Sequence, residues 1–223
     1  MAEILTRFEE GFPKAHWDWV RLHLKEIFDF EPDCLPTFYS NRFLMPWQGA
    51  ATWIEERKVV SLQLRESFRQ GTFWGYNRDE ILAHEAVHAA RSAFDEPKFE
   101  EFFAFMVSEK WWRRALGPII QRPWEVWPFI VGVFLGLFFP AIHLITAFWV
   151  GMGSWRLMKV HYKMKRASRA IMKFIKDPKR VRAVLFRLTD REIELFSHDK
   201  NIFVYAEKQH CLRWKLIRLA YWR

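Results

Sequence analysis

The sequence predicts a mainly α-helical fold with a small β-hairpin or sheet (α+β), joined to a helical hairpin embedded in a membrane. Three observations indicate this fold. Several stretches repeat apolar residues at helical spacing, one short stretch alternates as paired strands do, and one run of 30 residues carries no charge. We expect a soluble part over residues 1–122, a membrane-embedded segment over 123–156, and a basic, amphipathic helical part over 157–223.

The composition fits a folded protein that works beside a membrane. Hydrophobic residues make up 51% of the 223 residues, and 13 tryptophans and 22 phenylalanines exceed what a core needs. Tryptophan collects where a protein meets the membrane–water interface. The formal net charge of +9 suits either nucleic acid or an anionic membrane surface. Two cysteines supply no disulfide framework and no thiolate zinc site, and they are compatible with a reducing compartment.

The first third of the chain predicts one helix and one strand pair. Residues 1–30 show helical spacing, and their acidic side chains exclude a secretory signal, so we expect this part to stay in the cytosol. Residues 33–49 contain two prolines and predict irregular structure. Ala51–Glu55 and Val59–Leu64 favour two short strands joined by a charged turn.

Two helices are predicted next. The first covers Arg78–Phe94, because Asn77 and Glu80 have the spacing of a capping box just before its apolar residues. The second follows after a short break, with Pro97 in its first turn, where proline is tolerated.

The run without charge extends over Val126–Trp155, between Glu125 and Arg156. A stretch beyond about 18 apolar residues favours the bilayer over a buried core helix, which is the alternative. Tryptophans near both ends resemble interfacial anchors. They are Trp124, Trp127, Trp149 and Trp155.

Pro140 interrupts this run near its middle and predicts a kink or a reversal. One crossing needs about 20 residues and two need about 40, so the length fits a hairpin or one tilted span. Gly132 and Gly136 form a G-x-x-x-G pattern, which indicates close helix packing. Basic residues on both sides favour a hairpin with both ends in the cytosol. They are Lys110, Arg113, Arg114 and Arg122 before the run, and Arg156, Lys159, Lys163, Lys165, Arg166 and Arg169 after it.

The C-terminal part predicts a basic helix on the lipid surface. Residues 156–182 carry eleven lysines and arginines against one aspartate, and anionic head groups attract such clusters by about 1 kcal/mol per charge. A solvated helix that only sets topology is the alternative. Thr189 and Glu192 form a capping box for another helix, and residues 211–223 favour a last amphipathic helix. Because the basic charge lies beside the membrane run, we expect no nucleic-acid partner.

The stretch ILAHEAVHAARSAF, residues 81–94, contains an H-E-x-x-H motif. His84 and His88 are four residues apart and therefore share one helix face, where both rings can point a nitrogen at one ion about 2 Å away. Glu85 lies beside the first histidine and can take a proton from the attacking water. A surface helix with fortuitous histidines is the alternative to a metal site.

A catalytic zinc usually has three protein ligands and one water. The stretch EEFFA, from Glu100 to Ala104, offers the third ligand. Here the sequence resembles the gluzincin-type zinc metallopeptidases, in many of which a glutamate on the helix after H-E-x-x-H binds zinc and stands three residues before a small residue. The resemblance implies the metal ligands His84, His88 and Glu101, with Glu100 as the alternative. Twelve residues separate His88 from Glu101, fewer than in most gluzincins.

The resemblance implies a zincin-like helical catalytic core that binds Zn²⁺ and hydrolyses peptide bonds, with Glu85 as the general base. Together with the membrane run, it predicts a membrane-anchored zinc metallopeptidase whose active site faces the cytoplasm. Peptides or membrane proteins would be its substrates, beside a bilayer with anionic head groups. The chain also resembles the CAAX-protease and heat-shock membrane protease group, although those proteins place membrane helices before the motif as well.

Two other interpretations stay open: a non-enzymatic membrane hairpin that binds anionic lipid, and a purely structural zinc site. Metallopeptidases of this kind resemble one another in an edge strand that binds extended substrate, and Val59–Leu64 is the candidate for this strand. The oxyanion-stabilising residue is also left open. Candidates are Tyr76, Tyr162, Arg91, His16, His23, His143, His161, His198 and His210.

Overall fold

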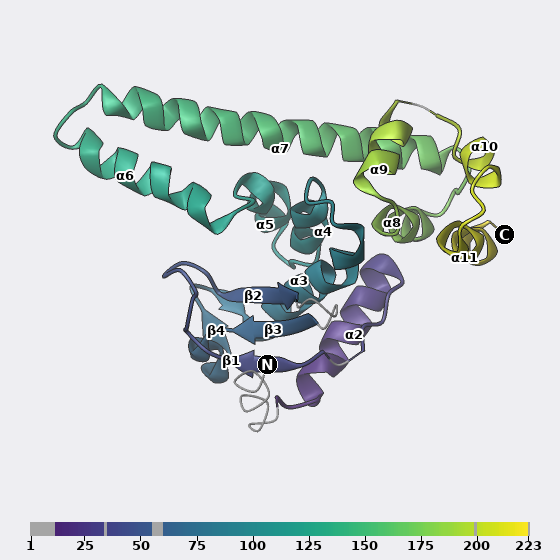
Figure 1. Ribbon diagram of the computed structural model, residues 1–223, viewed down its shortest axis with the longest axis horizontal. Coiled ribbons are helices and arrows are strands. Elements are labelled where there is room, and N and C mark those ends of the chain that lie inside the picture. Colours follow the sequence, from purple (N-terminus) through teal and green to yellow (C-terminus); the bar gives the residue numbers. More distant parts are fainter. Residues whose placement is uncertain (1–11, 34, 55–59, 199, 223) are drawn as a thin grey trace.

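A small sheet and the helices packed on it form the body of the protein, and a long helical hairpin extends from this body (Figure 1). The computed structural model describes residues 12–33, 35–54, 60–198 and 200–222. Helices predominate and the sheets are small, which confirms the predicted mainly α-helical fold with a small sheet.

The larger sheet has three strands in the order β1–β3–β2. β3 (Val60–Leu64) is antiparallel to β2 (Ala50–Ile54) and parallel to β1 (Thr37–Tyr39). The predicted strand pair is confirmed, while its positions Glu55 and Val59 lie outside the described residues.

The prediction of irregular structure over residues 33–49 is wrong at Thr37–Tyr39, which form β1. Pro36 stands just outside the strand, where its missing N–H interrupts no ladder, and its carbonyl accepts a hydrogen bond from Leu62. A second small sheet pairs two strands that lead into the helix α3 (Arg78–Arg91). They are β4 (Thr72–Phe73) and β5 (Tyr76–Asn77), and they follow the 3₁₀ helix η2 (Glu66–Gln70).

Four α-helices complete the body. They are α2 (Ala15–Phe28), α3 (Arg78–Arg91), α4 (Glu100–Met106) and α5 (Trp111–Leu116), with the 3₁₀ turn η3 (Ser92–Phe94) after α3. Only half of the predicted capping box forms. Asn77 caps the backbone N–H of Asp79, but Glu80 turns inward, because Arg113 and Ser108 bind its carboxylate. α4 begins three residues after Pro97, so this proline precedes the helix instead of lying in its first turn.

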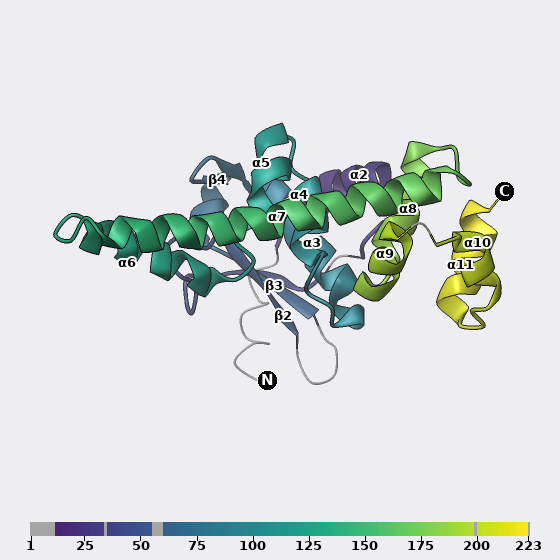
Figure 2. The ribbon, with the colours of Figure 1, turned by 90° about the horizontal axis from the view of Figure 1, so that it is seen from above.

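The charge-free run folds into a helical hairpin. α6 (Val126–Gly136) and α7 (Ile142–Met172) pack along each other, and the chain reverses in the segment that contains Pro140 (Figures 1 and 2). The 3₁₀ turns η4 (Gly117–Ile119) and η5 (Pro123–Glu125) join α5 to α6. None of the helices among the described residues combines the length and the apolar character that crossing a bilayer needs.

Close packing inside the hairpin explains the two glycines of α6. A Cβ atom at Gly132 would overlap Thr146, and one at Gly136 would overlap the ring of His143. The prediction of close helix packing from the G-x-x-x-G pattern is therefore confirmed. His143 lies in the contact between the helices.

The C-terminal helices follow α7 in the chain, and the first two of them pack against its far end, as seen from above in Figure 2. They are α8 (Pro178–Phe186), α9 (Asp190–Ser197), α10 (Ile202–Glu207) and α11 (Leu212–Tyr221). The capping box of Thr189 and Glu192 is confirmed. The basic stretch 156–182 is not one helix, because α7 ends at Met172 and Asp177 caps the start of α8.

One hydrophobic core joins the N-terminal body to the C-terminal helices. It includes buried side chains from β3, α2, α3 and α4 and from α7, α8, α9 and α11. Stacked rings of Phe28 and Phe186, 4.5 Å apart, connect α2 to α8. The body and the C-terminal helices therefore fix each other in place.

Candidate metal centre

α3 presents its histidines to α4 because its other face is buried in the core. Leu82, Ala83, Ala86 and Val87 are buried, and His84 and His88 lie at the edge of this buried face, partly exposed. The predicted sharing of one face by the two histidines holds: their Nε2 atoms are 3.2 Å apart. Both rings therefore point at one place.

Glu101 completes a cluster that can hold a metal ion. One of its carboxylate oxygens lies 3.8 Å from His84 Nε2, and the other lies 3.6 Å from His88 Nε2. Ligand atoms placed tetrahedrally at about 2 Å from a zinc ion would be about 3.3 Å apart. The two histidine nitrogens, 3.2 Å apart, are close to this value, and each oxygen of Glu101 lies somewhat farther from one of them, at 3.6 and 3.8 Å. Two imidazoles with a carboxylate suit zinc.

Hydrogen bonds and an ion pair from the C-terminal part hold the start of α4, and with it Glu101, close to α3. Asp190, at the start of α9, accepts hydrogen bonds from the backbone N–H groups of Lys98 and Phe99, at 2.7 and 3.3 Å. The same carboxylate binds Arg91 at the end of α3, at 3.1 Å. Asp190 thereby binds the connection between the two helices at both of its ends. The twelve residues between His88 and Glu101 are therefore enough to bring Glu101 beside the histidines.

Glu100 faces the other ring nitrogen of His88. Its carboxylate lies 2.8 Å from His88 Nδ1, so Nε2 is left for a metal. The ring of His84 is held in a similar way by a hydrogen bond to the backbone of Ala104. Such outer partners fix the orientation of metal-binding histidines and make them better ligands. Of the two predicted glutamates, Glu101 belongs to the cluster that can hold a metal and Glu100 orients the ring of His88.

Glu85 is buried and lies in the same cleft. The hydroxyl of Thr52, on β2, donates to Glu85 Oε2 at 2.6 Å. The other carboxylate oxygen stays available to a substrate or a water. Thr52 was not predicted from the sequence, because its contact with Glu85 depends on how β2 packs on α3.

Burial is the largest single influence on the pKa of each of these groups, although neighbouring charges together can outweigh it. It lowers the pKa of His84 well below its usual value, and the charge of His88 lowers it further, so this ring is the neutral form that binds metals. Burial acts in the same direction on His88, but its hydrogen bond with Glu100 and the nearby carboxylates outweigh burial and raise its pKa to about 9. Burial raises the pKa of Glu101 to about 7 and also raises that of Glu85.

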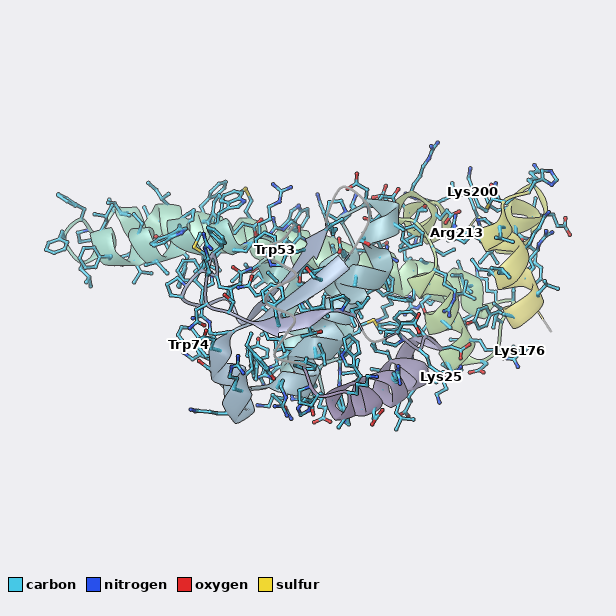
Figure 3. All side chains as sticks on the ribbon, turned by 60° about the horizontal axis from the view of Figure 1, so that its bottom comes forward. Lys25, Trp53, Trp74, Lys176, Lys200 and Arg213 are labelled. Carbon is cyan, nitrogen blue, oxygen red and sulfur yellow. The ribbon has the colours of Figure 1, made fainter. Side chains whose placement is uncertain are left out.

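A cleft of about 730 Å³ opens beside the cluster. Its lining is largely apolar and aromatic, and it includes Trp74 at the β4–β5 turn, labelled in Figure 3. Of the nine candidates for an oxyanion-stabilising residue, only Tyr76 lines this cleft. Arg91, by contrast, binds Asp190 and the backbone carbonyls of Phe186 and Leu188.

The edge strand of the cleft is β2 rather than β3. The prediction of Val59–Leu64 was wrong, because β3 pairs with β1 on one side and with β2 on the other, which leaves its backbone no free edge. β2 pairs on one side only within the described residues, and Ala50, Ala51 and Thr52 line the cleft. The backbone of β2 is therefore the one that an extended peptide can reach.

Comparison of the chain with protein-family models, with curated proteins and with solved structures finds no match.

Proposed function

We propose that this protein is a membrane-anchored zinc metallopeptidase. The observation that carries the proposal is the convergence of His84, His88 and Glu101 on one point beside a cleft that also contains Glu85. A zinc ion that only stabilises a fold usually has four protein ligands. Three groups converge here among the described residues, which leaves a position for water or substrate and favours a catalytic ion.

The residues of the site have distinct roles in this proposal. Zinc bound in such a site supplies Lewis-acid chemistry, which polarises a carbonyl and lowers the pKa of water. Glu85, with its raised pKa, takes the proton from the attacking water and delivers it to the leaving amine. Thr52 holds one oxygen of Glu85, and Glu100 holds His88 in the orientation that binds the metal.

The cleft supports an extended peptide with large apolar side chains as the substrate. The free edge of β2 offers backbone hydrogen bonds, as edge strands do in β-strand addition. Several aromatic and apolar side chains line the remaining wall. They are Phe68, Phe73, Trp74, Phe105, Trp112 and Leu116.

The hairpin is the proposed membrane anchor. α6 has 11 residues and a length of about 16 Å, roughly half of the hydrocarbon core of a bilayer, so the hairpin would enter one leaflet with both ends on the cytoplasmic side. Its outer surface is apolar and exposed, as the side chains projecting from the hairpin in Figure 3 indicate. Residues at least 60% exposed there are Phe134, Leu137, Phe138, Phe139, Leu144, Ile145 and Phe148.

Metal content and peptide cleavage test the proposal together. Purified wild-type protein should contain about one zinc ion, and His88→Ala should contain almost none, since it lacks one of three ligands. Glu85→Gln should keep the zinc and lose cleavage of an apolar reporter peptide by about a hundredfold or more. Cleavage that survives in Glu85→Gln would exclude Glu85 as the base, and a metal-free wild-type protein would exclude the enzyme altogether.

A further inference from the structure

A second cavity, of about 690 Å³, lies at the base of the hairpin. The segment 119–126 forms one wall and the part of α7 from Trp149 to Lys163 forms the other. Apolar side chains line most of its surface, among them Phe129, Val150 and Met152. The metal site does not use this cavity, although Ile119, Ile120, Gln121 and Val126 line both cavities.

Cations gather in the lining of this cavity. Lys98, Arg156, Lys159 and Lys163 line it, against a single carboxylate, that of Glu125. Arg156 neutralises this carboxylate, with contacts of 2.7 and 3.0 Å.

A positive charge remains after the internal ion pairs are counted. Lys98 and Lys163 share one carboxylate, that of Glu194. Lys159 makes no ion pair within the described part of the chain, and its ammonium lies 4.9 Å from the ring of Trp155. The lining therefore favours an anion, which lysine side chains bind as point charges.

The apolar side of the cavity continues into the exposed surface of the hairpin. Phe129, Val150 and Met152 line the cavity and are also 45%, 41% and 46% exposed, so a chain inside the cavity can extend along the hairpin. Trp149 and Trp155 line the cavity as well, as tryptophans do at the level of lipid head groups.

We propose that this cavity binds one anionic phospholipid. Its phosphate would lie among Lys98, Lys159 and Lys163, and one acyl chain would follow Phe129 and Val150. A bare anion would leave the apolar walls uncovered, and an uncharged chain would leave the cations without a partner, so a molecule with both parts fits best. The proposal does not depend on metal binding or on peptide cleavage.

Calorimetric titration with short-chain lipids below their micelle concentration tests this site. Short-chain phosphatidylglycerol should bind saturably, one molecule per protein, and about tenfold more tightly than phosphatidylcholine with the same chains, because phosphatidylcholine carries no net charge. Inorganic phosphate should not bind at the same concentrations. Equal affinity for the two lipids, or phosphate binding as tight as that of phosphatidylglycerol, would overturn the proposal. Glu85→Gln should bind as the wild type does, so failure of the peptidase would leave this result intact.

Two pairs of variants on α7 distinguish binding inside the cavity from a general attraction of anionic lipid to the basic surface of the protein. Val150→Trp fills the cavity and should weaken phosphatidylglycerol binding at least about tenfold, whereas Met158→Trp, also exposed but outside the lining, should leave it unchanged. Lys159→Gln should weaken binding about tenfold, whereas Lys165→Gln, with the same change of charge outside this cavity, should not. The lysine pair keeps the test decisive if Val150→Trp does not fold. An equal loss in both members of a pair would exclude the cavity as the site.

Discussion

Three side chains of the proposed active site, two zinc ligands and the general base, depend on neighbours outside the ligand set. Glu100 binds His88 Nδ1, the backbone of Ala104 binds the ring of His84, and Thr52 binds Glu85. Each of these contacts leaves one defined atom directed at the cleft. Zinc affinity and activity should therefore respond to residues outside the ligand set.

The two adjacent glutamates should differ sharply when they are removed. Glu101→Ala removes a ligand and should leave the protein without zinc after dialysis, since two imidazoles remain. Glu100→Ala removes only the partner of His88 and should weaken zinc affinity about 10- to 100-fold, with one ion still bound at saturation. Competition with a zinc-binding dye measures both. The reverse order of effects would make Glu100 the ligand.

The affinity for zinc should rise with pH. The pKa of about 9 for His88 means that this ring is protonated at neutral pH in the metal-free protein, and zinc must displace the proton. Glu101, with a pKa of about 7, holds a second proton below that pH. Affinity should therefore rise about a hundredfold per pH unit below pH 7 and about tenfold per unit from there to pH 9. Dye competition across this range, corrected for titration of the dye, tests the prediction; a flat profile would contradict it.

α3 and α4 pack directly on each other, and α9 connects them a second time. The carboxylate of Asp190 binds Arg91 at the end of α3 and the backbone N–H groups before α4. Both Arg91 and Asp190 are buried, so neither group can exchange its partner for water. This contact converts two short helices into a rigid support for Glu101.

Asp190→Ala should therefore disturb the metal site from a distance. It leaves Arg91 buried without its carboxylate and should destabilise the protein by about 3 kcal/mol, measured by urea unfolding. Zinc affinity should fall with it, because the start of α4 loses its anchor. Arg191→Ala, an exposed neighbour on α9, is the matched control and should change neither quantity. Unchanged zinc affinity in folded Asp190→Ala would show that α4 does not need this anchor.

The whole molecule places two cavities side by side at the base of an apolar hairpin. The metal cleft and the cavity with four cations share the wall around Ile119 and Ile120. The hairpin extends past the body in both views (Figures 1 and 2). An active site in this position would lie close to the bilayer surface, which suits substrates within or beside the membrane.

Membrane attachment should depend on the tip of the hairpin. Leu137→Asp places a charge at the turn and should weaken binding to vesicles of phosphatidylglycerol and phosphatidylcholine by about a hundredfold. Leu22→Asp on α2 makes the same change at a site of similar exposure, 74% against 72%, and should bind as the wild type does. Vesicle flotation measures both variants. Equal binding by the two variants would locate the membrane contact elsewhere.

Local features of the structure could be predicted from the sequence. The spacing of His84 and His88 determines that they share a helix face, because four residues make about one helical turn. The capping box of Thr189 and the reversal at Pro140 likewise depend on residues close together in the chain. The half-formed capping box at Glu80 shows the limit, because a buried Arg113, 33 residues away in the chain, binds its carboxylate.

Only the tertiary structure decided how distant segments meet. Thr52 reaches Glu85 across 33 residues and Asp190 reaches Arg91 across 99, and no periodicity within a segment indicates such pairs. The same holds for β1, which joins the sheet as a third strand and thereby covers the edge of β3 that does not pair with β2. The sequence by itself determined the H-E-x-x-H face and a break near Pro140, since these depend on local backbone geometry, whereas the structure decided that this break is the turn of a hairpin. The position of Glu101 beside the two imidazoles, its anchor and the neighbouring cavity depended on long-range packing.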